Sequence, residues 1–326
     1  YTIRGTTHRD VIGWVSSLDK MRSHEPEYIF PSHTKPIIGS EEAMEALTIY
    51  RDAIQYVHDQ TIRLMNKGYY PDQIVEMVEL PDSIKSSPYL SEFYGTVRWS
   101  VKSIFNGYLG WFNGNPADLD PLSRKEEAQK FAKLAGGEAS LLNALEKSVL
   151  DGDMQWALEL SDKLIALDFE VDRVNYLRQK ALLYIGLRSS NPNKRNYFLS
   201  SAMELNDDFD DYPIAKRTEE GVGEISIDTI FSILSVRLNP ERVINQNIKA
   251  CFLFSSGLTR AITIRNQVAS VSANANLQCD ITVKTSELNF KMALSGLLNP
   301  VMALASGDIV VDGGNTNFLK FLSYFR

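Results

Sequence analysis

The chain has 326 residues, enough for two or three domains, and its 44% hydrophobic and 23% charged residues are ordinary for a soluble globular protein. A formal net charge of -7 argues against a nucleic-acid partner, because proteins that bind phosphate backbones usually carry clustered Lys and Arg. No apolar run reaches the roughly 20 residues that a membrane-spanning helix needs.

The first 39 residues are predicted to form the end of an α/β layer. Residues 1–4 have the pattern of a strand end, residues 10–21 that of an amphipathic helix, and residues 28–30 that of a short apolar strand. One face of the helix carries Val11, Trp14, Val15 and Leu18. The order strand, helix, strand indicates a βαβ-like layer, which is not stable alone because its strands need neighbours in a sheet.

Residues 40–205 are predicted to be entirely helical. Ser40, with two glutamates behind it, suits the N-cap of a long helix that ends near Lys67. Proline and glycine separate three further helices, at residues 71–77, 88–106 and 123–135. A degenerate pattern suggestive of tetratricopeptide-type hairpins follows, with helices at residues 138–150, 154–167, 172–186 and 194–205. In these hairpins we interpret Trp156 and Leu160 as core rather than as part of a peptide-binding groove.

The acidic stretch 206–224 has no apolar periodicity and is predicted to be a linker. Its charge run at residues 207–211 lacks the ligand spacing of a calcium loop, so we interpret it as a solvated loop. A second domain begins near residue 225, where helices are expected at residues 226–238, at 285–295 with Thr285 as the N-cap, after 300 and at 317–325. Alternation of apolar residues predicts strands at residues 248–255, 259–264, 268–272, 277–284 and 308–311. Asn266 favours a tight turn between the second and third of these strands.

Residues that could hold a metal ion are few. The four histidines stand at positions 8, 24, 33 and 58 without paired-ligand spacing, and no H-x-H-x-D-H, H-E-x-x-H or Cys-x-x-Cys motif occurs. A zinc hydrolase needs three or more convergent ligands around an activated water. His8 and His24 are expected at the surface. The two cysteines, Cys251 and Cys279, are interpreted as half-buried thiols that leave the redox compartment open.

Four blocks of sequence occur in an order typical of one enzyme family: PSHTKP at residues 31–36, YRDAIQYVHDQT at 50–61, YGTV at 94–97 and YLGWFNGNP at 108–116. They are very similar to blocks of the metallo-β-lactamase-type alkyl sulfatases, and the resemblance covers nearly the whole chain. It implies a multidomain protein. Residues 1–39 would be the C-terminal end of an α/β (αββα) metallo-β-lactamase-like catalytic domain, and residues 40–205 an all-α dimerisation domain. Residues 206–224 would be a linker, and residues 225–326 a small α/β sterol-carrier-like domain.

The resemblance implies roles for three charged or titratable residues. His33 matches the last histidine ligand of the family's two zinc ions, and a neutral imidazole on a short loop suits that role. Arg4 is our first choice for binding the sulfate group and Arg9 the second, because the planar guanidinium donates to two oxygens at once. For Arg9, a surface ion pair is an equal interpretation.

Three aromatic residues are candidates for the lining of a substrate channel. Trp99 stands near a position where many relatives place a histidine, and an indole cannot accept a proton. It could still line an alkyl channel. Tyr108 and Trp111 either line the same channel or pack between helices, and packing is the more ordinary role.

The function implied is that of an alkyl sulfatase, a sulfuric ester hydrolase that releases sulfate from alkyl sulfates such as dodecyl sulfate by zinc-activated water. Attack at sulfur and attack at carbon are both open. We expect the chain to be the C-terminal part of a periplasmic or secreted homodimer, inactive without a missing N-terminal catalytic segment that holds most of the zinc ligands. The alternative is a non-enzymatic lipid-binding and dimerisation module, which the shortage of metal ligands favours.

The C-terminal domain is expected to offer an apolar pocket to an alkyl tail. Its apolar residues exceed what one sheet face needs: Phe290, Met292, Leu294, Leu297, Leu298, Val301, Met302, Leu304, Phe318, Phe321, Leu322 and Phe325. An ordinary hydrophobic core explains the same residues equally well.

Overall fold

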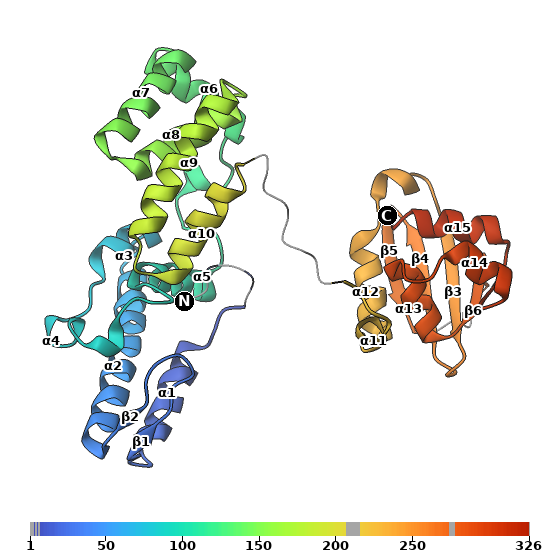
Figure 1. Cartoon of the computed structure of the whole chain (residues 1–326), viewed down its shortest axis with the longest axis horizontal. Helices are drawn as coiled ribbons and strands as arrows, with labels where there is room; N and C mark the ends of the chain where they lie inside the picture. The colour runs from blue at the N-terminus through green and yellow to red at the C-terminus, as the bar shows by residue number, and fades with distance from the viewer. Residues whose placement is uncertain (1–2, 4, 6, 207–215, 274–277, 326) are drawn as a thin grey trace. The chain divides into compact units, whose positions relative to one another are not determined.

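The computed structural model describes residues 3, 5, 7–206, 216–273 and 278–325, and the chain forms two compact units, Tyr1–Phe209 and Asp210–Arg326 (Figure 1). The acidic run at residues 207–211 lies outside the described residues. Among those that are described, no helix is both long and apolar enough to cross a membrane.

In the described part of the first unit, a helix is followed by a small hairpin. Helix α1 (Val11–Arg22) is followed by strands β1 (Tyr28–Ile29) and β2 (Ile37–Ile38), which pair antiparallel. Two strands joined by a short loop pair directly, whereas a parallel pair needs a long crossover. Residues 1, 2 and 4 lie outside the described residues, so the strand expected there, and with it the metallo-β-lactamase remnant, stays a prediction.

The long helix predicted from residue 40 is α2 (Ser40–Met65), and it packs along α1. Its N-cap is Gly39, whose φ of 117° favours glycine, so the expectation that Ser40 caps the helix is wrong. The helix predicted at 88–106 is also wrong in part, because the Thr96 side chain accepts a hydrogen bond from the Trp99 amide and starts a new helix at Val97. The other elements of this region are α3 (Pro71–Met77), α4 (Asp82–Lys85), η1 (Pro88–Leu90), α5 (Val97–Leu109) and η2 (Pro116–Asp118).

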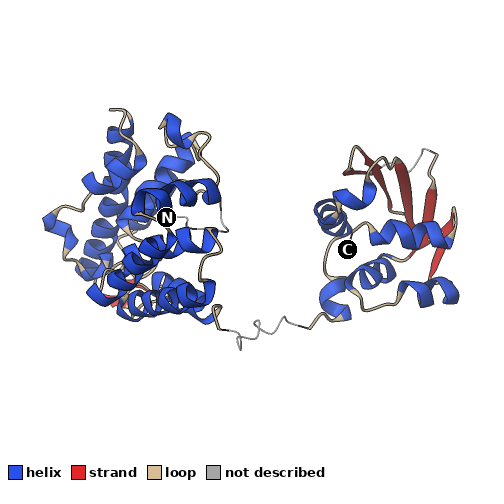
Figure 2. Ribbon diagram, turned by 90° about the horizontal axis from the view of Figure 1, so that it is seen from above, coloured by secondary structure: helices blue, strands red, loops and turns tan. Residues whose placement is uncertain are grey.

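Five helices complete the first unit, which Figure 2 shows as almost entirely helical. They are α6 (Arg124–Ala135), α7 (Glu138–Asp151), α8 (Met154–Ala166), α9 (Val171–Arg188) and α10 (Pro192–Met203). Each helix from α7 on packs against the next, as the sequence predicted. Leu160 is buried in their core, but Trp156 is half-exposed, with its ring against Phe131 at 6.3 Å between centroids.

The second unit is a mixed five-stranded sheet in the order β5-β4-β3-β6-β7 (Figure 2). Strands β3 and β6 are parallel and the other neighbours antiparallel. Asn266 and Gln267 form the predicted turn with φ of 50° and 61°. The strands are β3 (Ile248–Phe254), β4 (Thr259–Arg265), β5 (Val268–Ser272), β6 (Ile281–Thr285) and β7 (Ile309–Asp312). The helices are α11 (Glu219–Gly223), α12 (Ile227–Arg237), η3 (Pro240–Val243), α13 (Glu287–Ser295), α14 (Pro300–Ser306) and α15 (Asn315–Ser323).

Two expectations for this unit are wrong. Cys251 and Cys279 form a disulfide, with 6.0 Å between their Cα atoms. The parallel pairing of β3 with β6 places Cys251 opposite Thr282, which brings a cysteine 28 residues away within reach. The cap of α13 is Ser286 rather than Thr285, since the Ser286 hydroxyl accepts from the Asn289 amide. The end of the linker predicted at residues 206–224 is a short helix, α11. This helix packs on α13, and the Lys291 ammonium donates to the Gly223 carbonyl at 2.8 Å.

The core of the second unit is rich in aromatic side chains. Between centroids, the Phe231 ring lies 5.2 to 6.3 Å from the rings of Phe252, Phe254 and Phe290. The Phe290 ring lies 4.9 Å from that of Phe252 and 5.7 Å from that of Phe254, and Phe290 is 1% exposed. Phe318, Phe321 and Phe325 belong to the same core. For these residues, of the two interpretations left open by the sequence, the structure supports an ordinary core.

Candidate functional site

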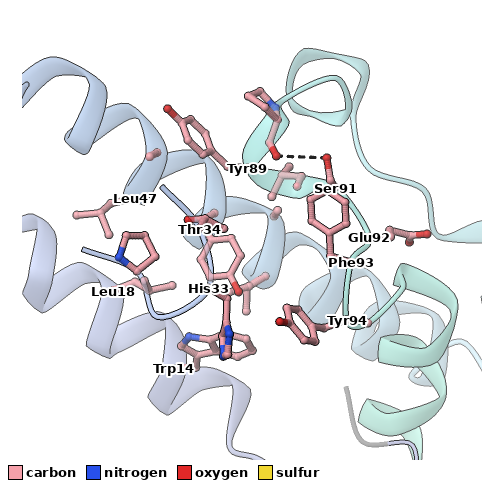
Figure 3. Close-up of a pocket in the computed structure, with 18 of the residues that line it drawn as sticks. Trp14, Leu18, His33, Thr34, Leu47, Tyr89, Ser91, Glu92, Phe93 and Tyr94 are labelled. Carbon is pink, nitrogen blue, oxygen red and sulfur yellow. Dashed lines mark hydrogen bonds between the residues drawn. The ribbon is translucent and has the colours of Figure 1, made fainter. Parts of the chain in front are cut away.

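The first unit contains a cavity of ≈ 950 Å³ between α1, the β1–β2 hairpin, α2, residues 88–96 and the start of α5 (Figure 3). Most of its wall is apolar or aromatic. The aromatic side chains come from three separate parts of the chain: Trp14, Tyr50, Tyr89, Phe93 and Tyr94. A cavity of this size and lining suits a flexible apolar ligand.

Ion pairs hold α1 against α2 and so fix one side of the cavity. Arg51 donates to both oxygens of Asp19, from Nε at 3.0 Å and Nη2 at 3.1 Å, and Arg22 donates to Asp19 at 2.9 Å. The hydrogen bond from Arg51 is the main reason why the pKa of Asp19 lies below its ordinary value. Between the same two helices, the rings of Trp14 and Tyr50 meet edge to face at 5.9 Å between centroids.

The structure places two of the residues predicted to act on substrate or metal at this cavity. His33 lies in the loop between β1 and β2, is exposed, and has its ring 5.4 Å from that of Tyr94. Figure 3 shows His33 beside Trp14 and Tyr94. Arg9 also lines the cavity, next to His8. Arg4 lies outside the described residues, so its role stays a prediction.

The three aromatic residues predicted to line a channel lie elsewhere on or after α5. Trp111 is 71% exposed and follows the helix, and Tyr108 is exposed on its last turn. The α5 residues that do line the cavity are Val97, Ser100, Ser103 and Ile104, with the helical spacing of one face. Trp99, one residue before Ser100, is not part of this lining. A channel role for Trp99, Tyr108 and Trp111 stays a prediction.

His58 had no assigned role from the sequence, but the structure makes it a buried link between α2 and α5. It is 7% exposed, its Nδ1 lies 2.8 Å from an Asp59 oxygen and its Nε2 lies 2.9 Å from the Tyr108 hydroxyl. An ionised carboxylate only accepts, so Nδ1 donates to Asp59, and in a neutral imidazole Nε2 then accepts from the Tyr108 hydroxyl. In the sequence, the adjacent pair His58-Asp59 is the signal that could have indicated this contact.

Metal ligands do not converge in the described part of the chain. No group of three or more His, Cys, Asp or Glu side chains there is placed to hold a metal ion. His8 and His24 are exposed, as the sequence predicted. The donors that line the cavity are the imidazoles of His8 and His33 and the carboxylates of Glu42 and Glu92, and they do not form such a group. His33 could fill one position of a zinc ligand set, but these residues do not complete a site.

Two family models match the chain: "Alkyl sulfatase dimerisation" over residues 70–208 and "Alkyl sulfatase C-terminal" over residues 216–326. The chain is 35% identical over 337 residues to a linear primary-alkylsulfatase of a Pseudomonas species, covering 100% of this chain and 64% of the relative. It is 27% identical to the alkyl/aryl-sulfatase BDS1 of Saccharomyces cerevisiae, covering 100% of this chain and 51% of that one.

A solved structure gives the same picture of the fold. The stereoselective inverting sec-alkylsulfatase Pisa1 from a Pseudomonas species is 24% identical and superposes with a TM-score of 0.89, covering 98% of this chain and 51% of that chain. At this level of identity the likeness concerns the fold alone. The chain spans about half to two thirds of the length of the relatives that it matches.

Proposed function

Because the chain belongs to the alkyl sulfatase family, whose dimerisation and C-terminal domains it carries, we propose that it is part of an enzyme that hydrolyses alkyl sulfates such as dodecyl sulfate. The observation that carries the proposal is the cavity of ≈ 950 Å³, because it joins an aromatic and aliphatic wall to an arginine and a histidine. An alkyl sulfate matches this lining, because it is an apolar chain with one anionic group.

Under this proposal the cavity residues have two roles, burial of the alkyl chain and binding of the sulfate group. Leu18, Leu47 and the aromatic side chains bury the alkyl chain, and each CH₂ removed from water contributes about 0.8 kcal/mol. Arg9 binds the sulfate group with donors that keep their charge at any working pH. Arg4 is proposed as a second sulfate ligand, as the family resemblance implies.

Zinc is the proposed metal, with two ions in the complete enzyme. His33 is accessible on a short loop at the cavity and would supply one imidazole, while the other ligands would come from the part of the relatives that this chain does not span. When bound, zinc supplies Lewis-acid activation of water at neutral pH. What this chain's own residues contribute is the chain-binding wall, the sulfate donors and the placement of His33 against Tyr94.

We further propose that the enzyme is a homodimer in the periplasm or outside the cell. The match of residues 70–208 to a dimerisation domain supports the dimer, and most soluble oligomers close as two-fold pairs. The Cys251–Cys279 disulfide supports an oxidising compartment, because disulfides are rare in the reducing cytosol. Light scattering across dilutions tests the first proposal by the mass in solution.

The test of the activity is sulfate release from dodecyl sulfate by a protein in which this chain is joined to the part of the relatives that it does not span. We expect zinc-dependent release, and none from the 326-residue chain alone. If the joined protein binds alkyl chains but releases no sulfate under any metal supplied, the proposed function is wrong. The alternative, a lipid-binding module, would then be the better description.

A further inference from the structure

The segment Ser91–Thr96 forms one wall of the cavity although it is neither helix nor strand. It lies between η1 and α5 and carries Glu92, Phe93 and Tyr94, all of them exposed (Figure 3). A wall of this kind can hold a defined shape only if its backbone is fixed by other bonds, since irregular surface segments otherwise sample many conformations.

Two asparagines at the start of α10 fix this backbone from a distance of 99 residues in the sequence. The Asn191 amide donates to the Glu92 carbonyl at 2.7 Å, and the Asn193 amide donates to the Tyr94 carbonyl at 2.8 Å. The Glu92 carboxylate also accepts from the amide of Val97, the first residue of α5, at 2.8 Å. The start of α10 is thus hydrogen-bonded to two alternate residues of the cavity wall.

Asn191 is buried, and both polar groups of its side chain are hydrogen-bonded. Its side chain is 5% exposed, and burying an amide is costly unless its polar atoms are hydrogen-bonded. Its oxygen accepts from the Lys194 amide at 3.0 Å and caps α10, while its nitrogen donates to the wall. A helix cap alone needs only the oxygen, so the burial and the donation are a second role.

We propose that Asn191 and Asn193 are positioning residues that hold the aromatic wall of the cavity and thereby set the affinity for the alkyl chain. The inference rests on the proposed function for the identity of the ligand. Tyr94 connects this wall to His33, because the Tyr94 backbone is held by Asn193 and the Tyr94 ring lies 5.4 Å from the His33 ring.

The test uses Asn191→Asp and Asn193→Asp in the 326-residue chain. Aspartate keeps the size of the side chain and, at position 191, the oxygen that caps α10, but an ionised carboxylate cannot donate to the wall. Asn299→Asp is the matched control, since Asn299 caps α14 in the second unit through the Val301 and Met302 amides. Thermal unfolding and circular dichroism check that each variant is folded.

The probe is decane-1-sulfonate, an alkyl anion without an ester bond, titrated by calorimetry below the concentration at which it forms micelles. We expect each of the two wall variants to bind it about three- to tenfold more weakly, the size of one lost hydrogen bond. The control should bind with the parent's Kd. In the joined protein, the wall variants should raise KM for dodecyl sulfate more than they lower kcat.

Unchanged affinity in both wall variants would overturn the inference, as would an equal loss in Asn299→Asp. If Asn191→Asp does not fold, Asn193→Asp decides alone, because Asn193 is not the cap of α10. Absence of sulfonate binding by the parent chain also overturns it. If the parent chain binds the sulfonate but the joined protein releases no sulfate, this inference holds and the proposed function is wrong.

Discussion

Replacing Phe290 by alanine is expected to unfold the second unit at a much lower temperature while the first unit is unaffected. Phe290 is 1% exposed, and its ring lies 4.9, 5.5 and 5.7 Å from those of Phe252, Phe231 and Phe254. Truncation of a fully buried phenylalanine costs about 3–5 kcal/mol, because apolar burial is lost and a cavity remains. For a unit of this size, the melting temperature should fall by about 12–20 °C.

The assay is scanning calorimetry of the whole chain, with tryptophan fluorescence recorded over the same temperatures. All four tryptophans lie in the first unit, at positions 14, 99, 111 and 156, so fluorescence identifies that unit's transition. The fluorescence transition should stay in place while the other calorimetric transition moves. The matched control is Met302→Ala, which removes a side chain that is 65% exposed in the same unit and should cost less than about 0.5 kcal/mol.

A fall of less than about 4 °C in Phe290→Ala would refute this reasoning, since it corresponds to about 1 kcal/mol and to a side chain that the core does not need. That outcome would revive the apolar pocket expected from the sequence. Stabilisation of the parent's second unit by dodecanol would point the same way, because a ligand raises the stability of the state that binds it.

The remaining predictions concern charge, redox state and metal. The pKa of Asp19 is lowered in the folded state, so its pairing stabilises the protein above the unfolded pKa near 3.8, and this is lost as the pH falls through the lower folded value. Between pH 7 and pH 3 the fluorescence melting temperature should therefore fall more in the parent than in Asp19→Asn, and equal falls would contradict the ion pair. Removing the disulfide by Cys251→Ala with Cys279→Ala should destabilise the second unit by about 3–4 kcal/mol, for a separation of 28 residues. Thiol titration of the oxidised, unfolded chain should find no free thiol. In the joined protein, His33→Ala should reduce bound zinc and activity together, and full zinc by metal analysis would remove His33 from the ligand set.

Features set by local chemistry could be predicted from the sequence. The turn at Asn266 follows from tolerance of positive φ, and the start of α6 follows from Ser123 and Glu126, which form a capping box. The division of residues 88–106 could not be predicted, because Thr96 serves equally well inside a helix pattern or as an N-cap.

The candidate site could be predicted only in part, because its geometry depends on contacts between distant residues. The family resemblance led to His33 and Arg9, and both line the cavity. No pattern near Asn191 indicates its bond to Glu92, and nothing in the spacing of Cys251 and Cys279 shows that β3 and β6 are neighbours. Such pairings arise from the topology, which periodicity does not encode.

The two sides of the cavity differ in how freely they can change. Leu47 and Ala46 are buried in the 26-residue helix α2, so substitutions there would disturb the packing of the whole unit. Phe93 and Tyr94 stand exposed on an irregular segment whose backbone is held by amide groups elsewhere. Their side chains can be exchanged without loss of core packing. Natural variation or laboratory evolution could therefore reshape ligand preference at these two positions at little expense in folding.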